Sequence, residues 1–194
     1  MTSEGNTAAD VVPQQGVVTV SRTVATPAHR VFELLADPSR HPDFDGSGML
    51  RSAPENRPIT AVGDVFVMKK FYGDLGEHET EDHVVEFEVD RRIAWEPAAR
   101  DAGPAAASGV PTGERTGHRW GWELQPDGPG ATVVTEIYDC SRAPESVRTQ
   151  VHEGRAWRRS MEKSLERLDA TRRDSPPAVG ISRRGISTSS LSRE

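Results

Sequence analysis

Hydrophobic and polar residues alternate along much of the chain, in a pattern that predicts an antiparallel sheet. Between residues 17 and 25, Val18, Val20 and Val24 fall on one face, and small hydroxyl side chains fall on the other. Turn residues at 126–130 predict that the last two strands form a hairpin. In total we expect about six or seven strands, over residues 17–25, 49–53, 64–72, 77–89, 93–96, 118–125 and 132–140.

Two short helices are predicted directly after the first strand. Thr26 is a good N-cap residue, and Pro27 suits the first helical position. This helix should end near Asp37, because a residue that precedes proline disfavours the helical region. Residues 38–46 are expected to form a second, irregular helix or turn that carries Phe44.

A long amphipathic helix is predicted at the C-terminal side of the strands. Apolar residues recur at steps of three and four from residue 144 to 172, which is the helical period. Gly154 lies in the middle of this stripe, where it indicates close packing or a slight bend. Antiparallel strands with helices set apart are typical of the α+β class. One striped helix could cover one face of the sheet, so the pattern predicts a sheet that grips a helix.

The two ends and one internal segment differ in composition from the rest. Residues 1–15 are small and polar, and residues 173–194 are rich in serine and arginine, so we expect both to be disordered. Residues 16–172 would then form one domain. Within it, residues 97–116 are rich in proline, alanine and glycine and are predicted to be an extended flexible loop. The alternative is a lid over a pocket, although a lid usually closes with apolar residues.

Charge and cysteine content narrow the function classes. The net charge is -6, whereas nucleic-acid binding needs a clustered positive field. The single cysteine, Cys140, can form no internal disulfide, and we expect it to be a buried or edge thiol. No apolar run approaches the ~20 residues that span a bilayer, and residues 1–15 lack the features of a secretory signal. We therefore expect a cytoplasmic protein with no membrane insertion.

Motifs for bound cofactors and nucleophilic catalysis are not found in the sequence. The histidines and acidic residues show no recognised metal-ligand spacing, and no glycine-rich phosphate loop follows a strand. There is no Gly-x-Ser-x-Gly elbow either. We therefore expect no metal and no cofactor.

Three segments resemble a known superfamily. They are VSRTVATPAHRVFELLADPSRHPDF (Val20–Phe44), HVVEFEVDRRIAWEP (His83–Pro97) and GHRWGWELQPDGPGATVVTEIYDCS (Gly117–Ser141). They resemble the START-like, SRPBCC superfamily in its polyketide cyclase/dehydrase branch. The resemblance implies a helix-grip fold, as in the birch-pollen allergen, with a deep cavity between sheet and last helix. It also implies hydrophobic ligands such as polyketides, lipids or aromatic compounds. The connection over 97–116 is longer than is usual in this superfamily.

Alternation and helical spacing select the apolar candidates for the cavity wall. Trp120 and Trp122 share one face of their strand, and Trp157 and Met161 share one face of the long helix. Ordinary core packing is the alternative for these residues, since aromatic and methionine stripes are more often core than ligand site. The apolar candidates are Phe44, Phe66, Met68, Trp120, Trp122, Tyr138, Trp157 and Met161.

Two charged residues fall on apolar faces. Arg22 shares a face with Val18, and Glu136 is in register with Val134 and Tyr138. In the helix-grip topology the first and last strands are neighbours, so Arg22 and Glu136 could pair as a polar anchor for a ligand. The alternatives are an ordinary ion pair at the sheet edge and side chains that point outward.

The sequence leaves three functions open. The first is a carrier or sensor of a small hydrophobic molecule. The second is an aromatase/cyclase-like enzyme, in which His83, His118, Glu136 or Tyr138 would move a proton. We expect His83 on the inner face of the sheet, beside Val85, where the alternative is a structural histidine whose hydrogen bonds are satisfied. The third and weakest is a protein-interaction module. The sequence does not predict the oligomeric state.

Overall fold

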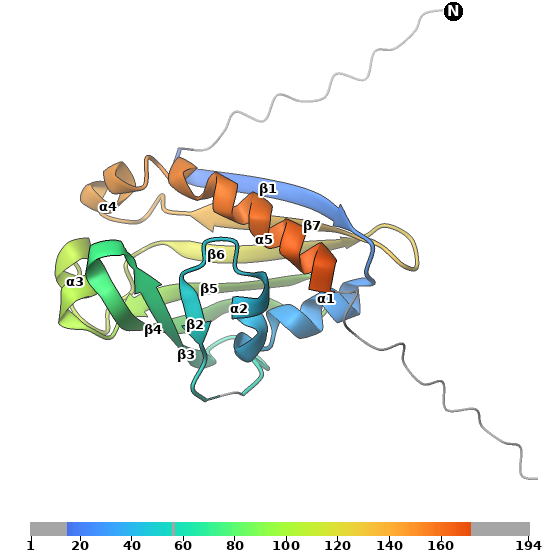
Figure 1. The fold of residues 1–194 in the computed structure, drawn as a ribbon, viewed down its shortest axis with the longest axis horizontal. Helices are drawn as coiled ribbons and strands as arrows, with labels where there is room; N and C mark the ends of the chain where they lie inside the picture. The colour runs from blue at the N-terminus through green and yellow to red at the C-terminus, as the bar shows by residue number, and fades with distance from the viewer. Residues whose placement is uncertain (1–14, 56, 172–194) are drawn as a thin grey trace, which may run out of the picture.

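An antiparallel sheet of seven strands forms the body of the computed structural model, which describes residues 15–55 and 57–171 (Figure 1). The strand order is β1-β7-β6-β5-β4-β3-β2, so the first and last strands are neighbours. This arrangement confirms the predicted α+β helix-grip fold. The tails predicted to be disordered lie, except for Gln15, outside the described residues. The strands are β1 (Val17–Val24), β2 (Leu50–Ser52), β3 (Val65–Tyr72), β4 (Gly76–Glu88), β5 (Arg92–Ala99), β6 (Arg119–Pro126) and β7 (Thr132–Asp139).

Helices pack against the concave side of the sheet and at its ends. The last helix, α5, runs along β1 and β7, and α1 and α2 are the two short helices predicted after the first strand (Figure 1). No helix in the described part of the chain is long and apolar enough to cross a bilayer. The α-helices are α1 (Ala28–Leu35), α2 (His41–Phe44), α3 (Ala102–Ser108), α4 (Glu145–Gln150) and α5 (Arg158–Thr171), with 3-10 turns η1 (Pro38–Arg40), η2 (Gly73–Leu75) and η3 (Arg155–Trp157).

The prediction of one continuous helix over 144–172 is wrong in its middle. The chain leaves α4 after Gln150 and does not resume an α-helix until α5 begins. His152, Glu153 and Gly154 have φ angles of 50°, 54° and 84°, which no right-handed helix contains. A Cβ atom at Gly154 would lie 3.0 Å from both the Tyr138 ring and the Val18 side chain. Glycine thus lets the backbone close onto the Tyr138 ring, and the chain bends there.

The prediction of an unstructured loop over 97–116 is also wrong. Strand β5 continues to Ala99, and α3 follows it. The buried Glu96 carboxylate binds the Arg115 guanidinium at 3.0 Å and also that of Arg142, which ties this excursion to the segment after β7. The alanines of α3 favour a helix, and Ala98 in β5 forms a β-bridge with Arg115 on the returning chain. The segment between them is therefore ordered.

The concave face of the sheet has two unlike halves. The half nearest α1, here called the filled half, is packed with buried aliphatic and aromatic side chains. The other half lies nearest α3 and α4 (Figure 1). This half, here called the hollow half, carries larger aromatic and polar side chains and contains a cavity. The filled half contains Val24, Phe32, Leu35, Val84, Ile93, Leu124, Val134, Leu165 and Leu168.

Helix α2 packs closely against α5 and closes one side of the hollow half. A Cβ atom at Gly46 would lie only 2.0 Å from the Ser160 carbonyl oxygen of α5, so only glycine fits there. The Gly46 amide donates a hydrogen bond to Ser164 Oγ at 3.0 Å, and that hydroxyl donates to the Ser160 carbonyl at 3.1 Å. This contact holds the segment after α2 close to helix α5.

Candidate functional site

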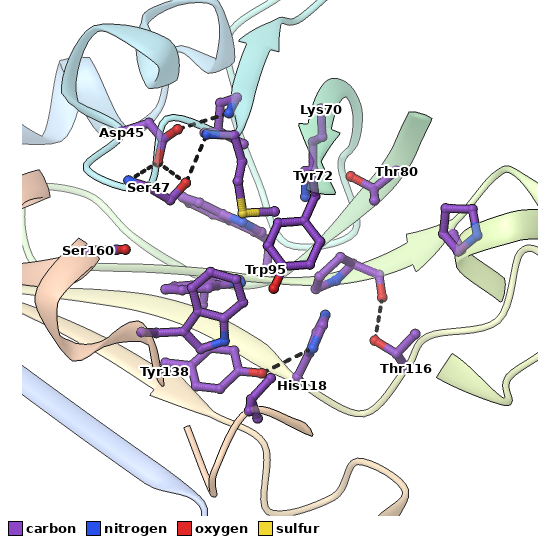
Figure 2. Close-up of a pocket in the computed structure, with 18 of the residues that line it drawn as sticks. Asp45, Ser47, Lys70, Tyr72, Thr80, Trp95, Thr116, His118, Tyr138 and Ser160 are labelled. Atoms are coloured by element: carbon purple, nitrogen blue, oxygen red, sulfur yellow. Dashed lines mark hydrogen bonds between the residues drawn. The ribbon is translucent and has the colours of Figure 1, made fainter. Parts of the chain in front are cut away.

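A cavity of about 260 Å³ lies in the hollow half, between the sheet and the helices (Figure 2). Its floor comes from the ends of β3, β5 and β7 and from the starts of β4 and β6. Helices α2 and α5 supply one side, and α3 and α4 supply residues at the far end. Segments that are distant in the sequence therefore meet around one space.

Aromatic rings make up much of the wall. The chain has four tryptophans, and all of them line the cavity: Trp95, Trp120, Trp122 and Trp157. The Trp120 ring lies 4.6 Å from the Tyr138 ring and 5.8 Å from the Trp157 ring, measured between centroids. Large rings that hold one another in place give a stiff apolar wall, which is typical of ligand pockets.

Glu136 and Trp122 are paired across β6 and β7, and both face the cavity. Glu136 is 4% exposed and Trp122 is also 4% exposed. Neither Glu136 Oε2 nor Trp122 Nε1 has a hydrogen-bond partner among the described residues. Burial raises the pKa of the Glu136 carboxyl well above its ordinary value, and the negative charge of Asp45 raises it further. This shift favours the neutral form of the Glu136 carboxyl, which can donate a hydrogen bond.

His118 and Tyr138 form a second polar pair, joined by a hydrogen bond of 3.3 Å between His118 Nδ1 and Tyr138 Oη (Figure 2). Burial, together with the charge of Lys70, lowers the pKa of His118 to about 4. Burial likewise raises the pKa of the Tyr138 hydroxyl above its ordinary value. Both groups are consequently neutral at pH 7, and the imidazole can accept a proton only at an energetic cost.

Lys70 brings a positive charge to the cavity wall, and a buried aspartate balances it. Lys70 Nζ lies 3.8 Å from Asp82 Oδ1, and the Asp82 side chain is 2% exposed. Thr80 Oγ1 donates a hydrogen bond of 2.8 Å to the other oxygen, Asp82 Oδ2. Because this ammonium already has a counter-ion, it is a weak site for a further anion.

His41 and Asp45 support the wall rather than offering free groups to the cavity. His41 Nε2 donates to the Leu35 carbonyl at 2.9 Å, and its ring stacks on Trp95 at 5.0 Å. Burial lowers the pKa of His41, which keeps the ring neutral. Both oxygens of Asp45 accept backbone hydrogen bonds, from Ser47 and Leu50, each at 2.9 Å. Among the described residues, no group of three or more His, Cys, Asp and Glu could hold a metal ion.

Comparison with known proteins decides the family. Residues 15–172 match the family described as polyketide cyclase / dehydrase and lipid transport. The chain belongs to this family.

Relatives and solved structures agree with membership of the polyketide cyclase/dehydrase and lipid transport family. Uncharacterized protein Rv0088 of Mycobacterium tuberculosis is 31% identical over 125 residues, which is 64% of this chain and 47% of the relative. The chain thus spans about half the length of the curated relatives it matches. An Arthrobacter aurescens protein solved by NMR has a TM-score of 0.60 at 13% identity, covering 89% of this chain and 94% of its own.

A Rhodobacter sphaeroides crystal structure has a TM-score of 0.58 at 16% identity, covering 84% of this chain and 95% of its own. At such low identities these likenesses show the fold alone.

Many of the residues proposed from the sequence meet at the cavity of this family member. Two others, Phe66 and Met68, lie in the packed core beside it, where the Phe66 ring meets the edges of Trp95 and His41, each at 5.5 Å. Cys140 is buried, as predicted for a structural thiol. The proposed residues that line the cavity are Phe44, His118, Trp120, Trp122, Glu136, Tyr138, Trp157 and Met161.

The predicted pair of Arg22 and Glu136 does not form. In the register of β1 and β7, Glu136 lies opposite Val20, while Arg22 lies opposite Val134. β1 is an edge strand, so the long Arg22 side chain extends into solvent and is exposed. Glu136 is therefore buried without a cation, and its neutral form replaces the predicted ion pair.

The prediction that His83 faces the cavity is wrong because of a β-bulge. The pairing of β4 with β5 shifts register between Val84 and Glu86, which changes the alternation by one residue. Before the bulge the inner face carries His78, Thr80 and Val84, whereas His83 lies on the outer face, 4.0 Å from Glu81. Simple alternation counted back from Phe87 therefore places His83 on the inner face, whereas the bulge puts it on the outer face.

Several cavity residues were missed in the sequence. Lys70 was in register with Phe66 and Met68, which is a signal that points to the inner face. The same alternation points to Tyr72, two residues after Lys70. Residues from α2 and α3 have no such signal, because they reach the cavity only once these helices are in place. The missed residues include His41, Asp45, Lys70, Tyr72, His78, Thr80, Trp95, Pro104, Ala107 and Ser160.

Proposed function

We propose that the protein binds one small, mostly apolar molecule in this cavity, as a carrier or sensor. The observation that supports this most is the aromatic cavity that all four tryptophans of the chain line. A stable core of this size needs no such hollow, since protein interiors are normally packed to crystal density. The family, which includes lipid transport and polyketide cyclisation, is consistent with this proposal.

The cavity volume restricts the ligand. At about 260 Å³ it lies near the lower end of ligand pockets, which span roughly 300–1,000 Å³. A compact ring system or a short chain suits this space better than a lipid with two long acyl chains. Because the wall is largely aromatic, flat ring systems would gain favourable ring contacts as well as burial.

A second candidate function, aromatase/cyclase-like catalysis, is favoured by the neutral acid and the neutral base in the same space. Glu136 and Tyr138 lie two residues apart on one face of β7, and His118 is bonded to Tyr138. A protonated carboxyl can give a proton to a carbonyl oxygen, and an imidazole can take one from a neighbouring carbon. That is the chemistry of an aldol cyclisation followed by loss of water.

Native mass spectrometry of the full chain tests the binding proposal. The protein is incubated with a cell extract, separated from free small molecules and sprayed under non-denaturing conditions. We expect a retained molecule at one copy per chain that a small naphthol displaces. Retention of nothing, together with no binding of the naphthol by calorimetry, would refute the proposal.

The choice between carrier and cyclase needs a reactive substrate. A short linear poly-β-ketone thioester is offered to the protein, and the products are compared with those of the spontaneous reaction. A carrier leaves the product distribution unchanged. A cyclase yields one dehydrated ring product in excess of the spontaneous reaction. Glu136→Met should abolish that excess.

A further inference from the structure

Glu136 and Trp122 each bring a buried polar atom without a hydrogen-bond partner to the wall of the cavity. The two residues are directly opposite in the register of β6 and β7. Side chains in such positions are close, with Cβ atoms roughly 5 Å apart. Both residues line the cavity, and Glu136 Oε2 and Trp122 Nε1 are buried with no partner in the described chain.

Buried polar atoms without partners are rare in native proteins, because each gives up its hydrogen bonds to water. Within the part of the chain that the structure describes, no group bonds to either atom: Arg22 lies away from the pair, and Asp45 is already bonded to backbone amides. Two such atoms on one cross-strand pair of a cavity wall indicate that their partner arrives with the ligand.

The chemistry of the two groups fixes what that partner is. An indole N–H only donates, and the Glu136 carboxyl, buried beside the Asp45 charge, donates as a neutral acid. We propose that Glu136 and Trp122 form a two-donor subsite for the carbonyl or phenolic oxygen of a neutral aromatic ligand. This subsite rests on the proposed function, because it requires that the cavity binds a ligand.

Charged ligands fit the subsite less well. A carboxylate would meet the charge of Asp45, and Lys70 is already balanced by Asp82 at 3.8 Å. An ammonium would have to remove the proton of Glu136 and would feel the positive field of Lys70, which also acts on His118. The ionisable groups that face the cavity are His41, Asp45, Lys70, Tyr72, His78, His118, Glu136 and Tyr138.

The experiment is a calorimetric titration of the full chain with four matched probes. They are a naphthol, the methylnaphthalene in which a methyl group replaces the hydroxyl, the corresponding naphthoate and the aminomethyl derivative. We expect the naphthol to bind about 5- to 10-fold more tightly than the methyl isostere. The anion and the ammonium should bind more weakly than the naphthol.

Variants then assign the preference to the subsite. Glu136→Gln keeps a donor of the same shape, so it should keep the naphthol preference. Glu136→Met should remove the preference while the methylnaphthalene affinity stays within about 2-fold. Trp122→Phe should reduce the preference in part. The control is Glu123→Met on the outer face of β6, where Glu123 pairs with Arg92 at 2.7 Å, and it should change no affinity.

Equal affinities of the wild type for naphthol and methyl isostere would overturn the subsite but leave the proposed function standing. Failure of every probe to bind would overturn both. A loss of preference in Glu136→Gln as large as in Glu136→Met would show that a charged carboxylate is needed, and would contradict the neutral donor. The wild-type probe series decides the matter even where a variant does not fold.

Discussion

The filled half and the hollow half of the sheet are built by the same strands, yet they differ in what their side chains do. Along β6, Leu124 packs in the filled half and Trp120 lines the cavity. Along β7, Val134 is packed and Tyr138 lines the cavity. Alternation therefore decides which residues face inward, and side-chain size and polarity decide whether the space is filled. The ionisable groups on the inner face line the cavity of the hollow half.

The largest expected effect compares two residues of α5. Leu165 and Met161 are each 1% exposed and lie one turn apart, Leu165 in the filled half and Met161 on the cavity wall. Leu165→Ala should lower the free energy of unfolding by about 2–5 kcal/mol, because it opens a void in a packed core. Met161→Ala should lose only about 1–2 kcal/mol, since it enlarges a space that already exists. Urea denaturation measures both, and equal losses would contradict the division into halves.

The next effect concerns pH and Glu136. The folded chain raises the pKa of this carboxyl above the value of 4.5, so it keeps a proton that the unfolded chain releases. Stability should therefore fall as pH rises above about 4.5, by about 1.4 kcal/mol per pH unit while Glu136 stays protonated. Glu136→Gln removes this loss. Its stability relative to the wild type should grow with pH from 5 to 7 and vary little below pH 4.

His118 acts in the opposite direction and must be separated from Glu136. Its pKa in the folded chain is about 4 against 6.5, so its contribution rises with pH between these values. The wild type and Glu136→Gln share this contribution, so their difference isolates Glu136. A difference that does not change with pH would show that Glu136 is not a buried neutral acid.

A smaller effect tests the bend that closes the hollow half. Gly154→Ala should lower the free energy of unfolding by roughly 2 kcal/mol, because the new Cβ would meet Tyr138 and Val18 at 3.0 Å in a left-handed backbone. Gly128→Ala is the control: its φ is 79°, but nothing lies within 4 Å of the added Cβ. It should lose only about 1 kcal/mol. Thermal unfolding of the pair measures the difference, and its absence would mean that the contact with Tyr138 is unimportant.

The smallest effect concerns α3 at the end of the cavity. Ala107 and Ala106 are neighbours on this helix and both are exposed, but only Ala107 lines the cavity. Ala107→Phe should weaken binding of a naphthol by about ten-fold, or about 1.4 kcal/mol, by narrowing the space. Ala106→Phe should leave the affinity within about 2-fold. Calorimetry compares them, and equal affinities would exclude α3 from the binding wall.

Much of the fold could be predicted from the sequence, because its signals are local. Alternation in β1 and β7 and the proline and glycine turn between β6 and β7 placed these strands within about two residues of their ends. The order of β1 beside β7 came from the resemblance to a known fold. The apolar stripe of the last helix continues through Val151 and Trp157, so the bend between them left Gly154 as its only signal.

The candidate site was less predictable, because it depends on a β-bulge and on tertiary contacts that local patterns in the sequence do not reveal. One bulged residue in β4 reversed the face of His83. The boundary between the filled half and the hollow half depends on α3, on the bend at Gly154 and on the contact of Gly46 with α5. All three are tertiary features. The charge state of Glu136 likewise follows from burial without a partner, whereas its place in β7 alone suggested an ion pair.

The central claim is that the hollow half binds a small apolar molecule, and the four tryptophans allow a direct measurement. Because all of them line the cavity, their indole N–H signals in a ¹H–¹⁵N spectrum report on its wall. Titration with a naphthol should shift all four indole signals along one saturable binding curve, while the backbone amide of the exposed Val89 stays in place. Indole signals that do not move, or shifts confined to surface amides, would contradict the account.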